Sequence, residues 1–97
     1  MATVRWSPQA RADLAAIEDY YLDVAPSYAD VVVDALLRSG RRLEAFPLSG
    51  RSVPEIEDPS IREVVWREYR VIYWADAERV DVLTVLHSSQ QFGSGPR

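Results

Sequence analysis

The chain has 97 residues, of which 47% are hydrophobic and 27% are charged, a balance typical of one globular domain with a single modest core. It contains no cysteine and no lysine, which excludes disulfides, thiolate chemistry and any mechanism that needs a lysine ammonium group. The net charge of -4 disfavours general binding to nucleic acid, and no apolar run approaches the roughly 20 residues of a membrane span.

The first half of the sequence predicts a short strand and two helices. Residues 4–6 favour a strand, and Ser7 and Pro8 then supply an N-cap and the proline that is tolerated in the first helical turn. Apolar residues recur every three or four positions up to a break at residues 25–26: Ala10, Leu14, Ile17 and Tyr21. A second amphipathic helix is expected over residues 27–45, with Gly40 allowing close approach of the first helix, so that the two form an antiparallel hairpin.

Residues 46–60 predict an extended surface connection, because they contain three prolines and Gly50. A loop of this length in a small domain usually has a function or covers another part of the fold. Its acidic end, which begins at Glu55, is expected to be solvated.

The last third of the sequence predicts three consecutive antiparallel strands, at residues 62–66, 69–74 and 80–87. The fold class is therefore α+β, with the element order β-α-α-β-β-β and the helices on one face of the sheet. A two-residue turn at residues 67–68 would place Val65 opposite Arg70 and Glu63 opposite Ile72. Residues 1–90 are expected to form the single domain, and the polar, glycine-rich residues 91–97 a flexible tail.

One face of the predicted hairpin is a candidate docking surface. Alternate residues of the strands place a largely apolar set on the side away from the helices: Ile61, Glu63, Val65, Arg70, Ile72 and Trp74. An antiparallel sheet with one layer of helices normally shows water a polar face, so this set suggests a surface that binds a partner. Trp74 is the strongest contact candidate, whereas Arg70 has two interpretations, pairing with Glu63 or gripping a partner.

Several short pieces of this sequence occur in a distinctive order and spacing: Trp6-Ser7-Pro8-Gln9-Ala10, Asp13-Leu14, Tyr20-Tyr21, Leu43, Pro47, Gly50-Arg51, Pro54-Glu55, Arg62-Glu63, Tyr69-Arg70-Val71-Ile72-Tyr73 and Val85-Leu86-His87. Together they resemble the RelE/ParE superfamily of bacterial toxins, and most closely its ParE branch, over nearly the whole chain. The resemblance implies a toxin neutralised by the C-terminal region of an antitoxin encoded beside it. The RelE branch cleaves messenger RNA on the ribosome, whereas the ParE branch is understood to inhibit DNA gyrase without a comparable nuclease site.

The residues argue against the nuclease. Cations are needed around a scissile phosphate, and the resemblance places Ile61 and Glu63 where RelE-type chains carry lysines and Gln90 near a later arginine. Only Arg70 remains, and a carboxylate beside it would repel phosphate. No catalytic residue is therefore assigned, and whether the chain is an enzyme stays open, with the balance against it.

The resulting hypothesis is a cytoplasmic, ParE-like toxin that inhibits DNA gyrase by binding it and forms a hetero-oligomer with its cognate antitoxin. No secretory signal, cofactor, membrane contact or direct nucleic-acid contact is expected, and His87, the only histidine, lacks neighbours at metal-ligand spacing. The candidate residues for binding antitoxin or target are Arg70, Trp74, Ile72, Glu63, Val65, His87 and Gln90. Two alternatives remain open: a ribosome-dependent ribonuclease of RelE type, and an inactive relative that only binds antitoxin, since Ser88-Ser89-Gln90-Gln91 replaces the basic residue that often follows this histidine in ParE-like chains.

Overall fold

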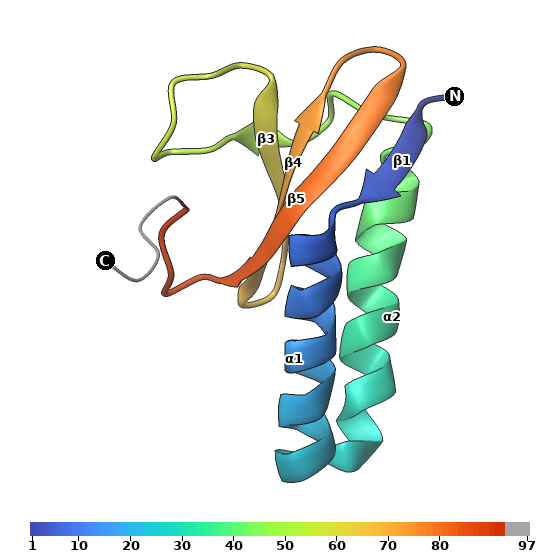
Figure 1. Ribbon diagram of the computed structural model, residues 1–97, viewed down its shortest axis with the longest axis vertical. Helices are drawn as coiled ribbons and strands as arrows, with labels where there is room; N and C mark the ends of the chain where they lie inside the picture. The colour runs from blue at the N-terminus through green and yellow to red at the C-terminus, as the bar shows by residue number, and fades with distance from the viewer. Residues whose placement is uncertain (93–97) are drawn as a thin grey trace.

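The computed structural model describes residues 1–92 as two helices packed on one face of a five-stranded sheet (Figure 1). The elements in chain order are β1 (Thr3–Trp6), α1 (Pro8–Val24), α2 (Pro26–Arg42), β2 (Arg51–Ser52), β3 (Ile61–Trp66), β4 (Tyr69–Ala75) and β5 (Arg79–His87). The strands lie side by side in the order β1-β5-β4-β3-β2. The predicted α+β class and the position of the helical hairpin are confirmed.

Local sequence signals set the ends of both helices. The hydroxyl of Ser7 caps α1 by accepting a hydrogen bond from the amide of Ala10 at 3.0 Å, and a proline occupies the first turn of each helix. Ala25 separates the helices as predicted. Gly40 has a different neighbour from the one predicted: a Cβ there would lie 2.6 Å from the ring of Trp6, so close approach of β1, rather than of α1, requires the glycine.

The central hairpin has the predicted register. Glu63 lies opposite Ile72 and Val65 opposite Arg70, with the turn at residues 67–68. Two features of the sheet were not predicted. The first strand, β1, pairs with β5 in parallel, and the two-residue strand β2 pairs with β3 inside the stretch expected to be an irregular connection.

The main core lies between the helices and the sheet. Its largest fully buried members are Tyr73, Leu36 and Leu43, and Val64 and Trp66 pack against it from β3. The helices extend well beyond the sheet (Figure 1). No helix within residues 1–92 is long and apolar enough to cross a bilayer.

The N-terminal half of α1 protects the free edge of β5. Strand β1 pairs with β5 only as far as Val82, so the later residues of β5 have no neighbouring strand on that side. The carboxylate of Asp13 accepts hydrogen bonds there from the amide of Val85 at 3.0 Å and from the hydroxyl of Thr84. Helix and strand are thereby joined by a polar contact in addition to the apolar core.

Candidate functional site

The sheet face opposite the helices is covered by two segments of the chain itself. The connection before β3 and the residues after β5 lie on the side of the sheet away from the helices (Figure 1). Val53 from the connection and Ile72 from β4 are fully buried, although neither belongs to the helix-side core. The expectation of an open face at Ile72 and Arg70 is therefore wrong, because the long loop acts as a cover.

An alternating chain of four charged side chains holds this cover in place. The Oε1 atom of Glu63 accepts from Nε of Arg70 at 2.7 Å, and its Oε2 accepts from Nε of Arg51 at 2.6 Å. The other two guanidinium nitrogens of Arg70 donate to both oxygens of Glu55, at 2.7 and 2.8 Å. The order is thus Arg51, Glu63, Arg70, Glu55, with each charge between or beside groups of opposite sign.

The segment after β5 is tied into the same network through its backbone. The carbonyl of Gln90 accepts from Nη1 of Arg70 at 3.1 Å, and the amide of Phe92 donates to Glu55 at 3.0 Å. Of the predicted flexible tail, residues 93–97 lie outside the described residues. Arg70 therefore links two strands, the loop and the chain beyond β5.

Burial and ion pairing shift the pKa values of two members of the network, Glu55 and Arg70. The hydrogen bonds from Arg70, assisted by the Phe92 amide and opposed by partial burial, lower the pKa of Glu55 from 4.5 to about 2. The bonds to Glu55, followed by those to Glu63, raise the pKa of Arg70 above its already high ordinary value despite its burial. Glu63 is 1% exposed and Arg70 is 7% exposed, so neither charge is stabilised by bulk water and each depends on its partners.

The start of the cover is anchored at Gly50. Its amide donates to the buried hydroxyl of Tyr73 at 2.8 Å, and Nη1 of Arg62 donates to the carbonyls of Leu48 and Gly50 at 3.1 and 3.0 Å. A Cβ at Gly50 would lie 2.4 Å from the Tyr73 hydroxyl oxygen and 2.8 Å from the carbonyl oxygen of Glu63. Only glycine fits there without a shift of the loop or the strand.

The predicted site residues fall into three groups. Glu63, Arg70 and the Gln90 backbone are in direct contact, whereas Ile72 is buried beneath the cover. His87 is exposed beside Tyr69, with Nδ1 2.8 Å from the Ser89 hydroxyl. Val65 and Trp74 lie apart from the charge network. Val65 is 49% exposed in a groove of about 640 Å³ between α2 and the outer edge of β3. Trp74 is partly buried, and the guanidinium carbon of Arg79 lies 4.7 Å from the centroid of its ring.

Two members of the network were missed from the sequence. Glu55 was expected to be solvated with its acidic neighbours, yet its side chain is 19% exposed and bound to Arg70. Arg51 was not considered as a partner of Glu63. One signal was present: an arginine with five N–H donors on an otherwise apolar face needs more acceptors than a single carboxylate provides.

The geometry leaves little scope for chemistry at this face. All the polar groups of Arg70 point to carboxylates or to a carbonyl of the chain, so the guanidinium has no free edge for a phosphate. No group of three or more side chains able to hold a metal ion occurs within residues 1–92. The network is therefore a structural clamp, and the surfaces that remain for a partner lie around it.

Comparisons with known proteins agree with this fold. A family model described as the ParE toxin of the type II toxin-antitoxin system parDE matches residues 4–92. A chain of the chromosomal ParDE toxin-antitoxin system from P. aeruginosa is similar in structure, with a TM-score of 0.75 and 22% identity over 90% of this chain and 96% of that one. A chain of the RelBE2 toxin-antitoxin complex from Mycobacterium tuberculosis has a TM-score of 0.64 and 24% identity over 89% and 96%. Among curated proteins, none matches the sequence.

Proposed function

The chain belongs to the ParE toxin family of type II toxin-antitoxin systems, and on that premise we propose that it acts by binding DNA gyrase and is neutralised by a cognate antitoxin. The observation that carries the choice of mechanism is the state of Arg70. It is the one cation that survives from the residues implied for a ribosome-dependent nuclease, and the N–H groups along its edges donate to Glu63 and Glu55. A clamp of this kind supports a toxin that works by protein contact.

The electrostatics support the same choice. A scissile phosphate gains charge in the transition state and needs cations close to it. Here the guanidinium is shared between two carboxylates, one of which has its pKa held at about 2 and so remains ionised at neutral pH. A phosphate approaching Arg70 would meet two negative charges before it displaced either of them.

The surface proposed for the antitoxin or gyrase consists of residues whose side chains lie outside the charge network and are at least partly exposed: Val65, Trp74, His87 and Gln90. Glu63, Arg70 and Ile72 are proposed to act indirectly, because they hold the cover that shapes this surface and are themselves buried. The groove at Val65 also borders the outer edge of β3, where β2 pairs only with Arg62 and Glu63. Backbone groups at such an edge can pair with an added strand of a partner.

Two assays on the same purified chain test the mechanism. The first follows plasmid supercoiling by gyrase, and the second follows a defined message on translating ribosomes. Loss of supercoiling with an intact message is expected. Message cleavage with normal supercoiling would identify a RelE-type ribonuclease, and no effect in either assay would identify an inactive relative that retains only antitoxin binding.

The binding surface has its own test, with the product of the adjacent reading frame as the probe. Val65→Glu and Trp74→Ala should weaken its binding at least ten-fold by calorimetry, since each removes apolar contact. Val31→Glu is the matched control, because Val31 is 47% exposed on α2 and is not one of the residues that line the groove at Val65. Equal affinity for all three variants and the natural chain would place the interface elsewhere.

A further inference from the structure

The helical hairpin has its charges sorted by sign along its length. Residues 12–37 contain six acidic residues and no basic residue: Asp13, Glu18, Asp19, Asp23, Asp30 and Asp34. Arginines flank this segment on both sides, at Arg5, Arg11, Arg38, Arg41 and Arg42. Because α1 and α2 run antiparallel, the two flanks meet at the sheet end of the hairpin, and most of the acidic residues lie toward its far end.

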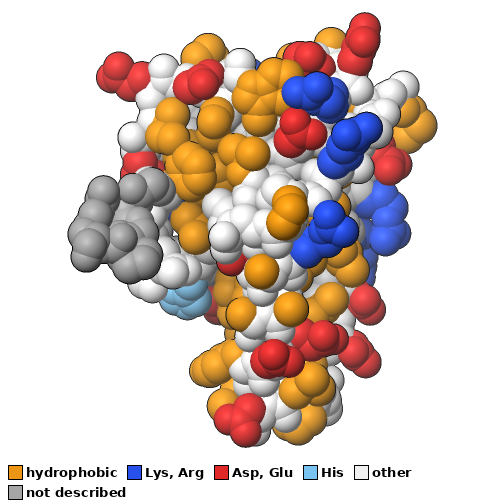
Figure 2. All heavy atoms as spheres, in the orientation of Figure 1, with side chains coloured by type: hydrophobic (Ala, Val, Ile, Leu, Met, Phe, Trp, Pro, Cys, Tyr) orange, Lys and Arg blue, Asp and Glu red, His pale blue; other side chains and the backbone are white. Residues whose placement is uncertain are grey.

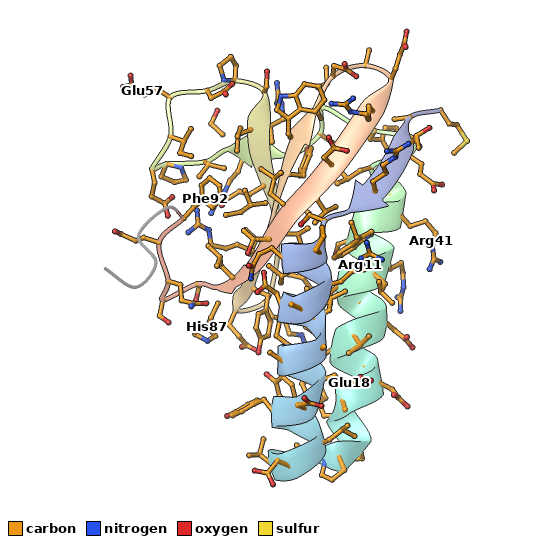
Figure 3. All side chains as sticks on the ribbon, in the orientation of Figure 1. Arg11, Glu18, Arg41, Glu57, His87 and Phe92 are labelled. Carbon is orange, nitrogen blue, oxygen red and sulfur yellow. The ribbon has the colours of Figure 1, made fainter. Side chains whose placement is uncertain are left out.

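Acidic and basic side chains both lie on the outer face of the hairpin, away from the core. Asp30, Asp34, Leu37 and Arg41 are spaced by four, three and four residues, so they follow one another along one stripe of α2. Figure 3 shows Arg11 and Arg41 near the sheet end of the hairpin and Glu18 farther along α1. In the space-filling view, blue spheres gather near β1 and the sheet end of α2, and red spheres lie toward the far end (Figure 2).

This outer face also has apolar content. Arg5, Trp6, Arg11, Leu14 and Leu37 line a groove of about 510 Å³ at the sheet end. Toward the far end, Leu22 is 52% exposed. The face therefore combines apolar side chains with charged ones, as the contact regions of protein interfaces do.

The charges on this face lack partners among the residues that the structure describes. No hydrogen bond or ion pair in residues 1–92 involves the side chains of Arg11, Glu18, Asp30, Asp34 or Arg41. The arginines of β2–β5 and their connections differ, because Arg51, Arg62, Arg67, Arg70 and Arg79 all have an acceptor. The charges of the outer hairpin face are thus available to another molecule.

We infer that this face is the contact between two copies of the chain, related by a two-fold axis that places the basic end of each hairpin on the acidic end of the other. In a two-fold contact each interaction occurs twice, once in each direction. A face that is basic at one end and acidic at the other is therefore complementary to a second copy of itself turned end for end. A partner of a single sign, such as nucleic acid, would match one end and be repelled by the other. The inference does not depend on the toxin mechanism.

The available area predicts a weak dimer. A 17-residue helix is roughly 25 Å long, and two helices side by side are roughly 20 Å wide, which gives about 500 Å² per copy and about 1,000 Å² in total. That total is at the lower end of specific interfaces. Dimerisation in the micromolar range, weakened by salt, is therefore expected.

Sedimentation equilibrium tests the inference on the isolated full chain at low salt, about 20 mM, and at high salt, about 500 mM. A dimer is expected at low salt, with its dissociation constant raised at least ten-fold at high salt and at least ten-fold by Arg41→Glu. Arg42→Glu is the matched control, since this neighbouring arginine lines the different groove beside β3 and makes the same change in net charge. A chain that is monomeric at every concentration, or is affected equally by the two variants, would overturn the inference.

A charge exchange identifies the partner surface. Arg11→Glu with Arg41→Glu reverses two charges at the basic end of the face, and Asp30→Arg with Asp34→Arg reverses two charges of its acidic part. Each double variant alone should be monomeric, and an equimolar mixture should form a one-to-one heterodimer. If both fold by circular dichroism and the mixture remains monomeric, the hairpin faces do not meet.

Discussion

The carboxylate of Glu63 lies within 2.7 Å of Nε and 2.6 Å of Nη2 of Arg70 on the adjacent strand, and both side chains are almost completely buried. Such a pair contributes little relative to an apolar pair of the same size, because desolvation offsets the attraction, but removal of one member leaves a buried charge unpaired. Here the pair also connects the sheet to Glu55 and Arg51. The clamp should therefore be most sensitive to the loss of a single charge.

Glu63→Gln should destabilise the chain by about 3 to 5 kcal/mol, because Arg70 keeps Glu55 as its only carboxylate partner and Arg51 loses its carboxylate. Thermal unfolding followed by circular dichroism should show a fall of more than about 10 °C in Tm for a domain of this size. Glu57→Gln is the control, since Glu57 is exposed and lies in the same loop (Figure 3). Similar Tm values for the two variants would show that the buried pair is not holding the fold.

Glu55 makes the clamp sensitive to acid. Its pKa in the folded chain is about 2, against an ordinary value of 4.5, so the stability that it provides is fully present above pH 4.5 and is lost as pH falls toward 2. The difference in urea midpoint between the natural chain and Glu55→Gln should therefore be constant from pH 7 to pH 5 and shrink below pH 4.5. A difference that is unchanged at pH 3 would mean that the carboxylate is not bound as described.

Gly50 and Tyr73 should be coupled. Gly50→Ala should cost about 1 to 3 kcal/mol, because the added methyl group overlaps the Tyr73 hydroxyl and the Glu63 carbonyl. Tyr73→Phe should cost a similar amount, since it leaves the buried Gly50 amide without its acceptor. Urea unfolding of the double variant should give a loss smaller than the sum, because the overlap with the hydroxyl is relieved. Strict additivity would contradict the contact.

Asp13 should stabilise the free edge of β5. Asp13→Ala leaves the Val85 amide and the buried Thr84 hydroxyl without their acceptor, at an expected cost of about 1 to 3 kcal/mol. Asp19→Ala on the exposed side of the same helix should change stability by less than about 0.5 kcal/mol. Hydrogen exchange of the Val85 amide should accelerate in the first variant alone; equal exchange in both would show that the strand edge is protected in another way.

The fold was largely predictable because its signals are local. The cap at Ser7, the break at Ala25 and the two-residue turn after Trp66 each follow from neighbouring residues, and the turn length alone determines that Val65 lies opposite Arg70. The parallel pairing of β1 and the two-residue strand β2 could not be predicted in the same way. Both depend on where distant segments meet.

The site was harder to predict than the fold for a related reason. The period of the strands placed Glu63 and Arg70 on one face, and their pairing was among the interpretations considered. The role of Glu55 was hidden, because an acidic loop residue next to other acidic residues has no periodicity that distinguishes an ion-paired side chain from a solvated one. That single loop residue changes the face from an open docking surface into a clamped one.

The most direct measurement for the proposed mechanism is plasmid supercoiling by DNA gyrase at increasing concentrations of the purified chain, with a defined message on translating ribosomes followed in parallel. Since Arg70 is held by two carboxylates, supercoiling should be inhibited in proportion to the chain added and the message should remain intact. Cleavage of the message while supercoiling proceeds normally would contradict the account.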